Sequence, residues 1–214
     1  MKPVPLQGTG FALTLSPPFS LGTPLGRTNN IGPDGATAIA AALALLTSLQ
    51  DLNLKGNQLG ADGWTAVADA LEGMTSLTSL NGCDKCRAIC TGGQTEMRLE
   101  GTELGVWAAR YLPLSASTLT KLNLSYNGMG DAGAEVVSKS LASLSRLVEL
   151  YLHQNGIGGA GGLAVAREAA RLSALRTLIL RNYESANTMD EETKAAIRGM
   201  LPHVTKGLGI TDGL

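Results

Sequence analysis

Three cysteines lie close together near the middle of the chain, and their side chains could bind a metal ion. Cys83, Cys86 and Cys90 follow the spacing CxxCxxxC, and the chain holds two histidines, His153 and His203. A structural zinc site takes four thiolate or imidazole ligands. If Cys83 and His153 share one row of a sheet, three strand spacings, or ~14 Å, separate them. Because zinc ligands lie ~2 Å from the ion, His153 cannot complete the site, and we expect no metal and no cofactor.

The other residues with reactive side chains do not form a recognisable catalytic motif. No serine, cysteine or lysine stands in a known nucleophile pattern. The glycine-rich stretch GIGGAGG, residues 156–162, lacks the lysine of a phosphate-binding loop. We therefore expect no catalytic residue and a protein that is not an enzyme. The alternative, an enzyme or metal protein, rests on the cysteines alone, and elemental analysis for zinc would decide it.

A different kind of chemistry, protein recognition, is available where polar and aromatic residues alternate with leucines. The residues are Glu149, Tyr151, His153, Ile179 and Arg181. In a strand, side chains between the inward leucines point to the opposite face. Tyr151 and Ile179 would then form an apolar centre with a polar rim, and tyrosine and arginine are favoured at binding hot spots. We predict that a protein partner binds here; the alternative is the ordinary variation of a solvated surface.

These residues belong to a repeat that must position them. The repeated stretches are LQDLNLKGNQLG (49–60), LTKLNLSYNGMG (119–130) and LVELYLHQNGIG (147–158). Asn29 and Asn57 are 28 residues apart, as are Asn127 and Asn155. A fixed period of this size indicates a repeat array.

Each repeat predicts one strand and one helix. The spaced leucines point inward from the strand, and an alanine-rich segment follows with apolar residues at helical spacing. One strand per repeat that returns through a helix gives a parallel sheet. The asparagine after each strand sits at a turn, where its amide can hydrogen bond to the backbone of neighbouring coils.

The regular pattern is interrupted in the middle and changes at both ends, although we expect residues 1–214 to form a single domain. The segment CDKCRAICTGG leaves little room for a helix, and Pro113 cuts the next helix short, so an irregular insertion is predicted over residues 83–118. Repeats are expected over residues 21–182. Residues 1–20 are a tail or degenerate cap, and residues 183–214 a C-terminal cap.

The motif LxxLxLxxNx(L/I/M)G with its alanine-rich helix resembles the leucine-rich-repeat family, specifically the ribonuclease-inhibitor type. The resemblance covers roughly residues 21–199. It implies an α/β fold, a horseshoe-shaped solenoid with parallel strands on the concave face and helices on the convex face. It also implies a non-enzymatic module that binds a protein on the concave face.

Two more specific functions remain open within this resemblance. The chain is similar to the repeat domains of NOD-like receptors, although these residues contain no nucleotide-binding domain. It is also similar to Ran GTPase-activating protein, a regulator of a small GTPase. That family carries a strongly acidic C-terminal tail, whereas this chain ends KGLGITDGL. A GTP-hydrolysis assay with a small GTPase would separate these readings.

Composition limits the other partners. The formal net charge is −1 and aromatic residues make up 4% of the chain, so nothing favours binding to nucleic acid or an anionic membrane. No apolar run reaches the ~18 residues of a membrane span. We read no signal peptide, and three cysteines do not make a disulfide framework. We therefore expect a cytoplasmic protein.

Overall fold

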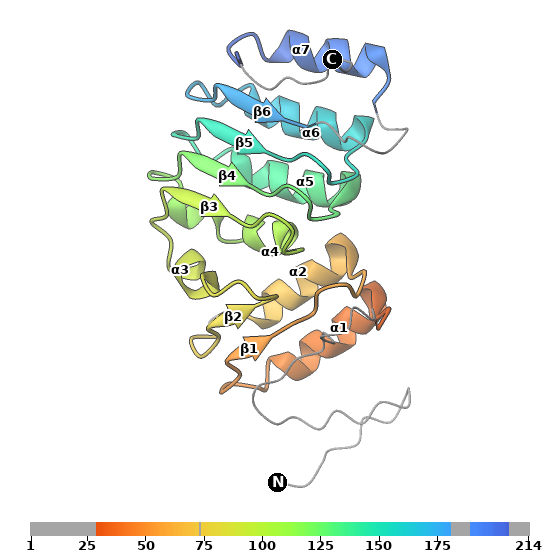
Figure 1. The fold of residues 1–214 in the computed structure, drawn as a ribbon, viewed down its shortest axis with the longest axis vertical. Coiled ribbons are helices and arrows are strands. Elements are labelled where there is room, and N and C mark those ends of the chain that lie inside the picture. The colour runs from red at the N-terminus through yellow and green to blue at the C-terminus, as the bar shows by residue number, and fades with distance from the viewer. Residues whose placement is uncertain (1–28, 73, 181–188, 206–214) are drawn as a thin grey trace, which may run out of the picture.

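The computed structural model describes residues 29–72, 74–180 and 189–205, whose elements stack into an elongated solenoid (Figure 1). The helices are α1 (Gly32–Leu43), α2 (Gly60–Ala70), α3 (Cys86–Thr91), α4 (Gly105–Ala109), α5 (Gly130–Leu141), α6 (Gly159–Ala169) and α7 (Glu191–Met200), with the 3-10 helix η1 (Leu112–Ser115). The strands are β1 (Asp51–Leu52), β2 (Ser79–Leu80), β3 (Glu96–Arg98), β4 (Lys121–Asn123), β5 (Glu149–Tyr151) and β6 (Thr177–Ile179).

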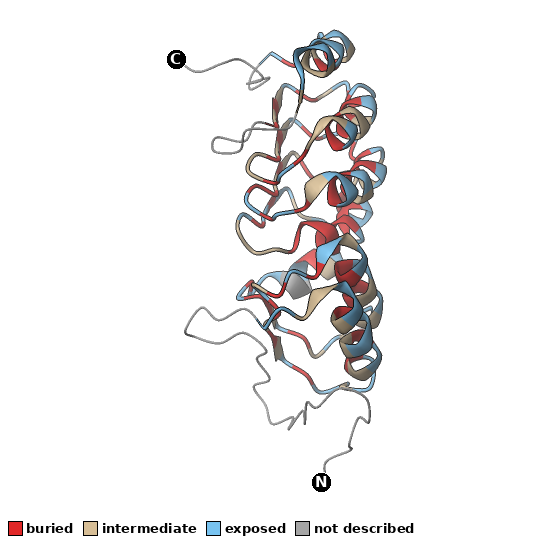
Figure 2. Cartoon of the chain, turned by 90° about the vertical axis from the view of Figure 1, so that its right-hand side faces the viewer, coloured by how far each residue is buried: buried red, intermediate tan, exposed pale blue. Residues whose placement is uncertain are grey.

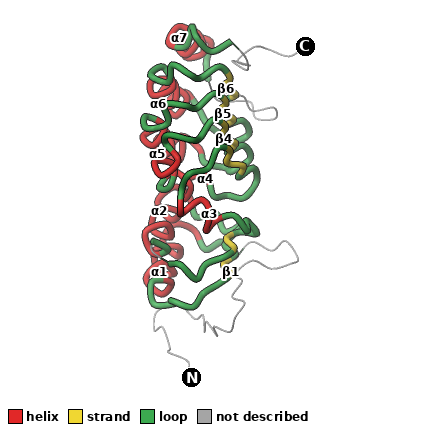
Figure 3. Tube along the Cα trace, turned by 90° about the vertical axis from the view of Figure 1, so that its left-hand side faces the viewer, coloured by secondary structure: helices red, strands yellow, loops and turns green. Residues whose placement is uncertain are grey.

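The molecule has two layers, with strands along one side and helices along the other (Figure 3). Buried residues lie between the layers, and exposed residues face outward from both (Figure 2). The leucines of the repeat supply this core: Leu119, Leu122 and Leu124 are all 0% exposed. Alternating helices and parallel strands confirm the predicted α/β solenoid.

The strands pair in parallel with the register that the repeats predict. β3, β4, β5 and β6 form one sheet in chain order, and β1 pairs with β2 in a second. Lys121 is aligned with Glu149 and then Thr177, and Asn123 with Tyr151 and then Ile179. We call the side of the two sheets that faces away from the helices the strand face. It corresponds to the concave face of the sequence prediction.

The loop asparagines join consecutive repeats through their side chains, as predicted. Asn155 donates from Nδ2 to the carbonyl of Leu152 at 2.8 Å in its own turn. It also donates to the carbonyl of Leu124 in the preceding repeat at 2.9 Å. Its Oδ1 accepts from the backbone N–H of Asn127 at 2.9 Å. One amide therefore satisfies backbone groups that the turns would otherwise bury unpaired.

The sheet is interrupted between β2 and β3, within the predicted irregular region. After β2 the chain turns back, so that Leu80 and Cys83 exchange two backbone hydrogen bonds of 3.1 and 2.8 Å. This bridge occupies the backbone N–H and carbonyl groups of Leu80, to which a following strand would otherwise hydrogen bond. Asn81 and Cys83 are buried beside this bridge, at 6% and 9% exposed.

The segment CDKCRAICTGG does contain a helix, contrary to the sequence prediction. α3 spans six residues, Cys86–Thr91, and ends at Gly92, whose φ is +77°. A Cβ atom at Gly92 would lie 2.5 Å from the carbonyl oxygen of Leu114, so glycine is required on both counts. The following helix α4 is only five residues long, and Pro113 lies in η1 rather than in its continuation.

The C-terminal helix α7 begins at an N-cap carboxylate. Asp190 accepts from the backbone N–H of Thr193 at 2.7 Å, which lowers the pKa of Asp190. Ile197 is fully buried, and a Cβ atom built at Gly162 of α6 would lie 3.2 Å from its side chain. The absence of a side chain at Gly162 thus gives room for α7 to pack closely on α6. The expected N-terminal tail, residues 1–20, lies outside the described residues, as do residues 183–188 and 206–214 of the expected C-terminal cap.

Candidate protein-binding surface

Glu149 and Tyr151 lie side by side on the strand face and are tied to the neighbouring strand. The Tyr151 hydroxyl donates to a carboxylate oxygen of Glu149 at 2.8 Å. Lys121 of β4 approaches the same oxygen to 2.7 Å and lies 5.3 Å from the centre of the Tyr151 ring. The Lys121 and Glu149 side chains remain 27% and 34% exposed. The three side chains therefore form a partly exposed cluster joined by these contacts, which we call the Tyr151 cluster.

The shared carboxylate keeps both donors of the Tyr151 cluster protonated. The hydrogen bond to Glu149 raises the pKa of Lys121. The same partner, followed by burial, raises the pKa of the Tyr151 hydroxyl. A carboxylate that accepts from both groups favours their protonated forms. Both groups are protonated at neutral pH at their ordinary pKa values, and the shifts extend this state to more alkaline pH.

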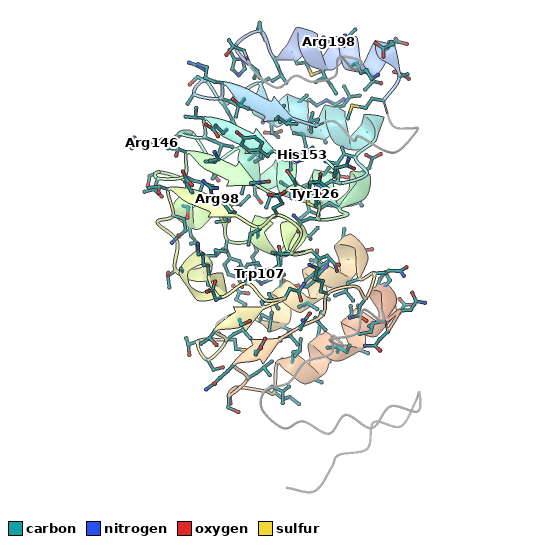
Figure 4. The ribbon with its side chains drawn as sticks, viewed as in Figure 1. Arg98, Trp107, Tyr126, Arg146, His153 and Arg198 are labelled. Carbon is teal, nitrogen blue, oxygen red and sulfur yellow. The ribbon has the colours of Figure 1, made fainter. Side chains whose placement is uncertain are left out.

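His153 follows β5 and is oriented by the turn after β4. Its Nδ1 lies 2.8 Å from the hydroxyl oxygen of Ser125. Its ring packs edge to face with Tyr126, with ring centres 5.3 Å apart, and both residues lie beyond the C-terminal ends of β4 and β5 (Figure 4). A serine beside a histidine is the start of a nucleophilic pair. However, Ser125 is 0% exposed, so a substrate cannot reach its hydroxyl, and the bond serves to orient the imidazole.

Tyr126 is a member of this surface that the sequence analysis missed. It is one of the large apolar side chains that remain exposed, at 49%. Its φ is +58°, a left-handed conformation that bulky residues rarely adopt. The position before the loop asparagine holds glycine in an earlier repeat, Gly56, with φ +78°. Comparison of the repeats would have shown a tyrosine in place of that glycine.

The remaining predicted residues extend the surface towards the C-terminus. Ile179 of β6 is aligned with Tyr151, and both are half-buried, so an aliphatic and an aromatic group do lie on adjacent strands. Arg181 lies outside the described residues. The structure thus places Glu149 and Tyr151 on β5, His153 just after β5 and Ile179 on β6. It adds Tyr126, in the turn after β4, to this surface.

Cys83 is buried and Cys90 is half-buried in the segment between β2 and β3. Burial raises the pKa of the Cys83 thiol and of the Cys90 thiol, and both thiols are free. Within the described ranges, no group of three or more histidine, cysteine or acidic residues is placed to hold a metal ion. No described helix is long and apolar enough to cross a bilayer.

Comparison with known proteins gives matches to the repeat units themselves. Residues 46–68 and 115–138 match the family model described as leucine rich repeat, and each segment contains a strand, its loop asparagine and the start of a helix. No curated protein matches the chain significantly. Among solved structures, the chain is similar to leiomodin-1 actin-binding site 2 at 21% identity, over 53% of this chain and 69% of that one, with a TM-score of 0.46. Two segments of the chain therefore match leucine-rich repeats, and the fold is a leucine-rich-repeat solenoid.

Proposed function

We propose that this chain is a non-enzymatic module that binds another protein on the strand face of its C-terminal repeats. The observation that carries the proposal is the pair of aromatic sites on adjacent strands and turns, the Tyr151 cluster and the Tyr126–His153 pair. Both are partly exposed, and both are oriented by hydrogen bonds or ring contacts. Tyrosine supplies a large rigid contact area, and hot spots are enriched in it.

Preorganisation strengthens the case for this surface over other exposed parts of the strand face. Binding costs conformational entropy for each side chain that it immobilises. Glu149 already holds Tyr151 and Lys121, and Ser125 already orients His153. A partner would therefore lose little free energy in ordering these groups. We include Ile179 and Arg181 in the proposed site as its C-terminal edge.

We further propose that the repeats are of the ribonuclease-inhibitor type and that the protein works in the cytoplasm. The repeat length of 28 residues and the regular helices of 11 or 12 residues, α1, α2, α5 and α6, support the first part. The free thiols of Cys83 and Cys90 support the second, because reducing compartments preserve free thiols.

Substitution of Tyr151 tests the proposed site. Tyr151→Ala should weaken partner binding by ~2 kcal/mol or more, because it removes an aromatic anchor from the centre of the surface. The matched control is Asn53→Ala, which truncates a strand-face residue next to β1, at the other end of the solenoid. The partner would be captured with the full chain and identified by mass spectrometry. Titration calorimetry would then compare the wild type with the two variants.

The two variants separate the possible outcomes. Unchanged affinity in Tyr151→Ala together with loss in Asn53→Ala would place the site at the N-terminal end and refute the proposal. Circular dichroism should show that both variants keep the wild-type fold. Tyr151 is half-buried and faces away from the leucine core, so its truncation leaves that core intact.

A further inference from the structure

The junction between β2 and β3 differs from the pairing of the other consecutive strands, because β2 and β3 belong to separate sheets. Elsewhere, neighbouring repeats exchange backbone hydrogen bonds, as from Asn81 N–H to the Leu52 carbonyl at 2.9 Å and from Leu124 N–H to the Tyr151 carbonyl at 2.9 Å. Between residues 29–82 and 96–205, the described residues exchange no backbone-to-backbone hydrogen bond. We call residues 29–82 the N-terminal block and residues 96–205 the C-terminal block.

Side chains supply the polar links across this junction. Asn81 accepts from Leu54 N–H at 2.7 Å and donates to the Thr102 carbonyl at 2.8 Å. It therefore has one partner in each block. Glu103 of the C-terminal block accepts from the backbone N–H of Gly56 at 2.9 and 3.0 Å.

On the helix side, an arginine supplies the corresponding link. Arg110, just after α4, forms ion pairs with Asp69 and Glu72 at the end of α2. The hydrogen bond to Glu72 raises the pKa of Arg110. The acidic side chains are 58% and 64% exposed, so water competes for these pairs. We call Asn81, Glu103 and Arg110 the latch.

Apolar packing fills the junction, but it leaves a polar group unpaired. α4 has five residues where the regular helices have eleven or twelve, and Trp107 of α4 is 0% exposed. Its ring packs against Tyr111, with ring centres 5.0 Å apart. The indole N–H of Trp107 is buried without a hydrogen-bond partner in the described part of the chain. An unpaired buried donor costs free energy in the structure that buries it.

We propose that the solenoid is two cooperative units, and that the N-terminal block opens at this junction while the C-terminal block stays folded. In a repeat protein, stability is the sum of repeat terms and nearest-neighbour interface terms. The interface between β2 and β3 lacks the backbone bonds of the others, so it is the plane along which the chain separates. The N-terminal block is the smaller of the two and opens first. The proposed binding surface lies wholly in the C-terminal block and persists in the opened form.

Hydrogen exchange measured by mass spectrometry tests this proposal on the intact chain. Amides of α1 and α2 report on the N-terminal block, and amides of α5 and α6 on the C-terminal block. Ile157→Val removes one methyl group from a residue that is 0% exposed in the C-terminal block. It should speed exchange in α5 and α6 by about two- to tenfold and leave exchange in α1 and α2 unchanged. Equal acceleration in both blocks would show a single cooperative unit and overturn the proposal.

The latch has its own matched pair of variants. Arg110→Gln removes ion pairs across the junction, whereas Arg171→Gln removes an exposed ion pair with Glu168 inside the C-terminal block. Arg110→Gln should speed exchange in α1 and α2 by about two- to fivefold, and Arg171→Gln should not change it. Asn81→Ala, which leaves a buried backbone donor unpaired, should speed it by about tenfold or more. If neither Arg110→Gln nor Asn81→Ala changes exchange in α1 and α2, these residues do not hold the blocks together.

Discussion

Tyr126 places an exposed ring at a turn position where the repeat imposes a left-handed backbone, as it also does at Gly56 and Gln154. The left-handed backbone at this position suits glycine, and Gly101 adopts it in the preceding turn with φ +66°. A side chain in this region costs roughly 1–2 kcal/mol relative to a relaxed backbone. The Tyr126 ring is 49% exposed, so burial of the ring offsets little of this cost. Strain of this kind is concentrated at functional sites.

Replacement of Tyr126 by glycine should therefore stabilise the fold and weaken partner binding. Relief of the left-handed strain, less the greater entropy of glycine in the unfolded chain, should raise the free energy of unfolding by roughly 0.5–1 kcal/mol. Gln154→Gly, at the corresponding position of the next repeat with φ +56°, should stabilise the fold similarly without loss of binding. Urea denaturation measures the first effect, and a lower midpoint for Tyr126→Gly would show that its contact with His153 outweighs the strain.

At the scale of single residues, the sequence predicts what its local spacing dictates. The asparagine of each loop could be assigned to backbone hydrogen bonding because it recurs at a fixed distance from the leucines, and Asn155 makes those bonds. The partners of Glu149 and His153 could not be assigned. They depend on rotamers and on a turn in the preceding repeat, which the spacing of leucines does not specify.

At the scale of elements, successive side chains of β4 alternate between the leucine core and the strand face. Leu122→Ala should lower the free energy of unfolding by about 2–5 kcal/mol, because the side chain is 0% exposed and its loss leaves a cavity. Lys121→Ala, its neighbour on the strand face, should change the melting temperature little. Thermal unfolding followed by circular dichroism compares the two variants. Similar shifts in both would contradict the register of β4 against β5.

The junction shows why one stretch of the fold could not be predicted from the pattern. The sequence indicated an irregular region because the step from the leucine at 80 to the methionine at 97 is too short for a full repeat. Its form depends on Cys83 turning back onto Leu80 and on Gly92 admitting the approach of Leu114. Both are long-range or turn-specific contacts that hydrophobic periodicity does not encode. The short helix α3 lies in the chain between Cys83 and Gly92, the residues that make these two contacts.

At the scale of the whole molecule, several cysteine, tyrosine and lysine side chains that titrate in alkali have raised pKa values. Burial raises the pKa of Cys83, Cys90 and Tyr111. The hydrogen bond to Glu149 raises the pKa of Lys121 and of Tyr151. Each group therefore holds its proton more tightly in the folded chain than in the unfolded chain. Their contribution to stability is complete below the unfolded pKa values and is lost as pH rises through the folded ones.

The solenoid should therefore keep a constant contribution from these groups at neutral pH and lose stability in alkali. The loss begins near the ordinary cysteine value of 9.0 and continues through the tyrosine value of 10.0. Melting temperatures measured from neutral pH to about pH 11 should fall along this course. Tyr111→Phe keeps the buried ring and removes its ionisable hydroxyl, so its melting temperature should fall less steeply in alkali than that of the wild type. Parallel curves for the two proteins would show that the Tyr111 hydroxyl ionises as readily in the folded chain as in the unfolded one.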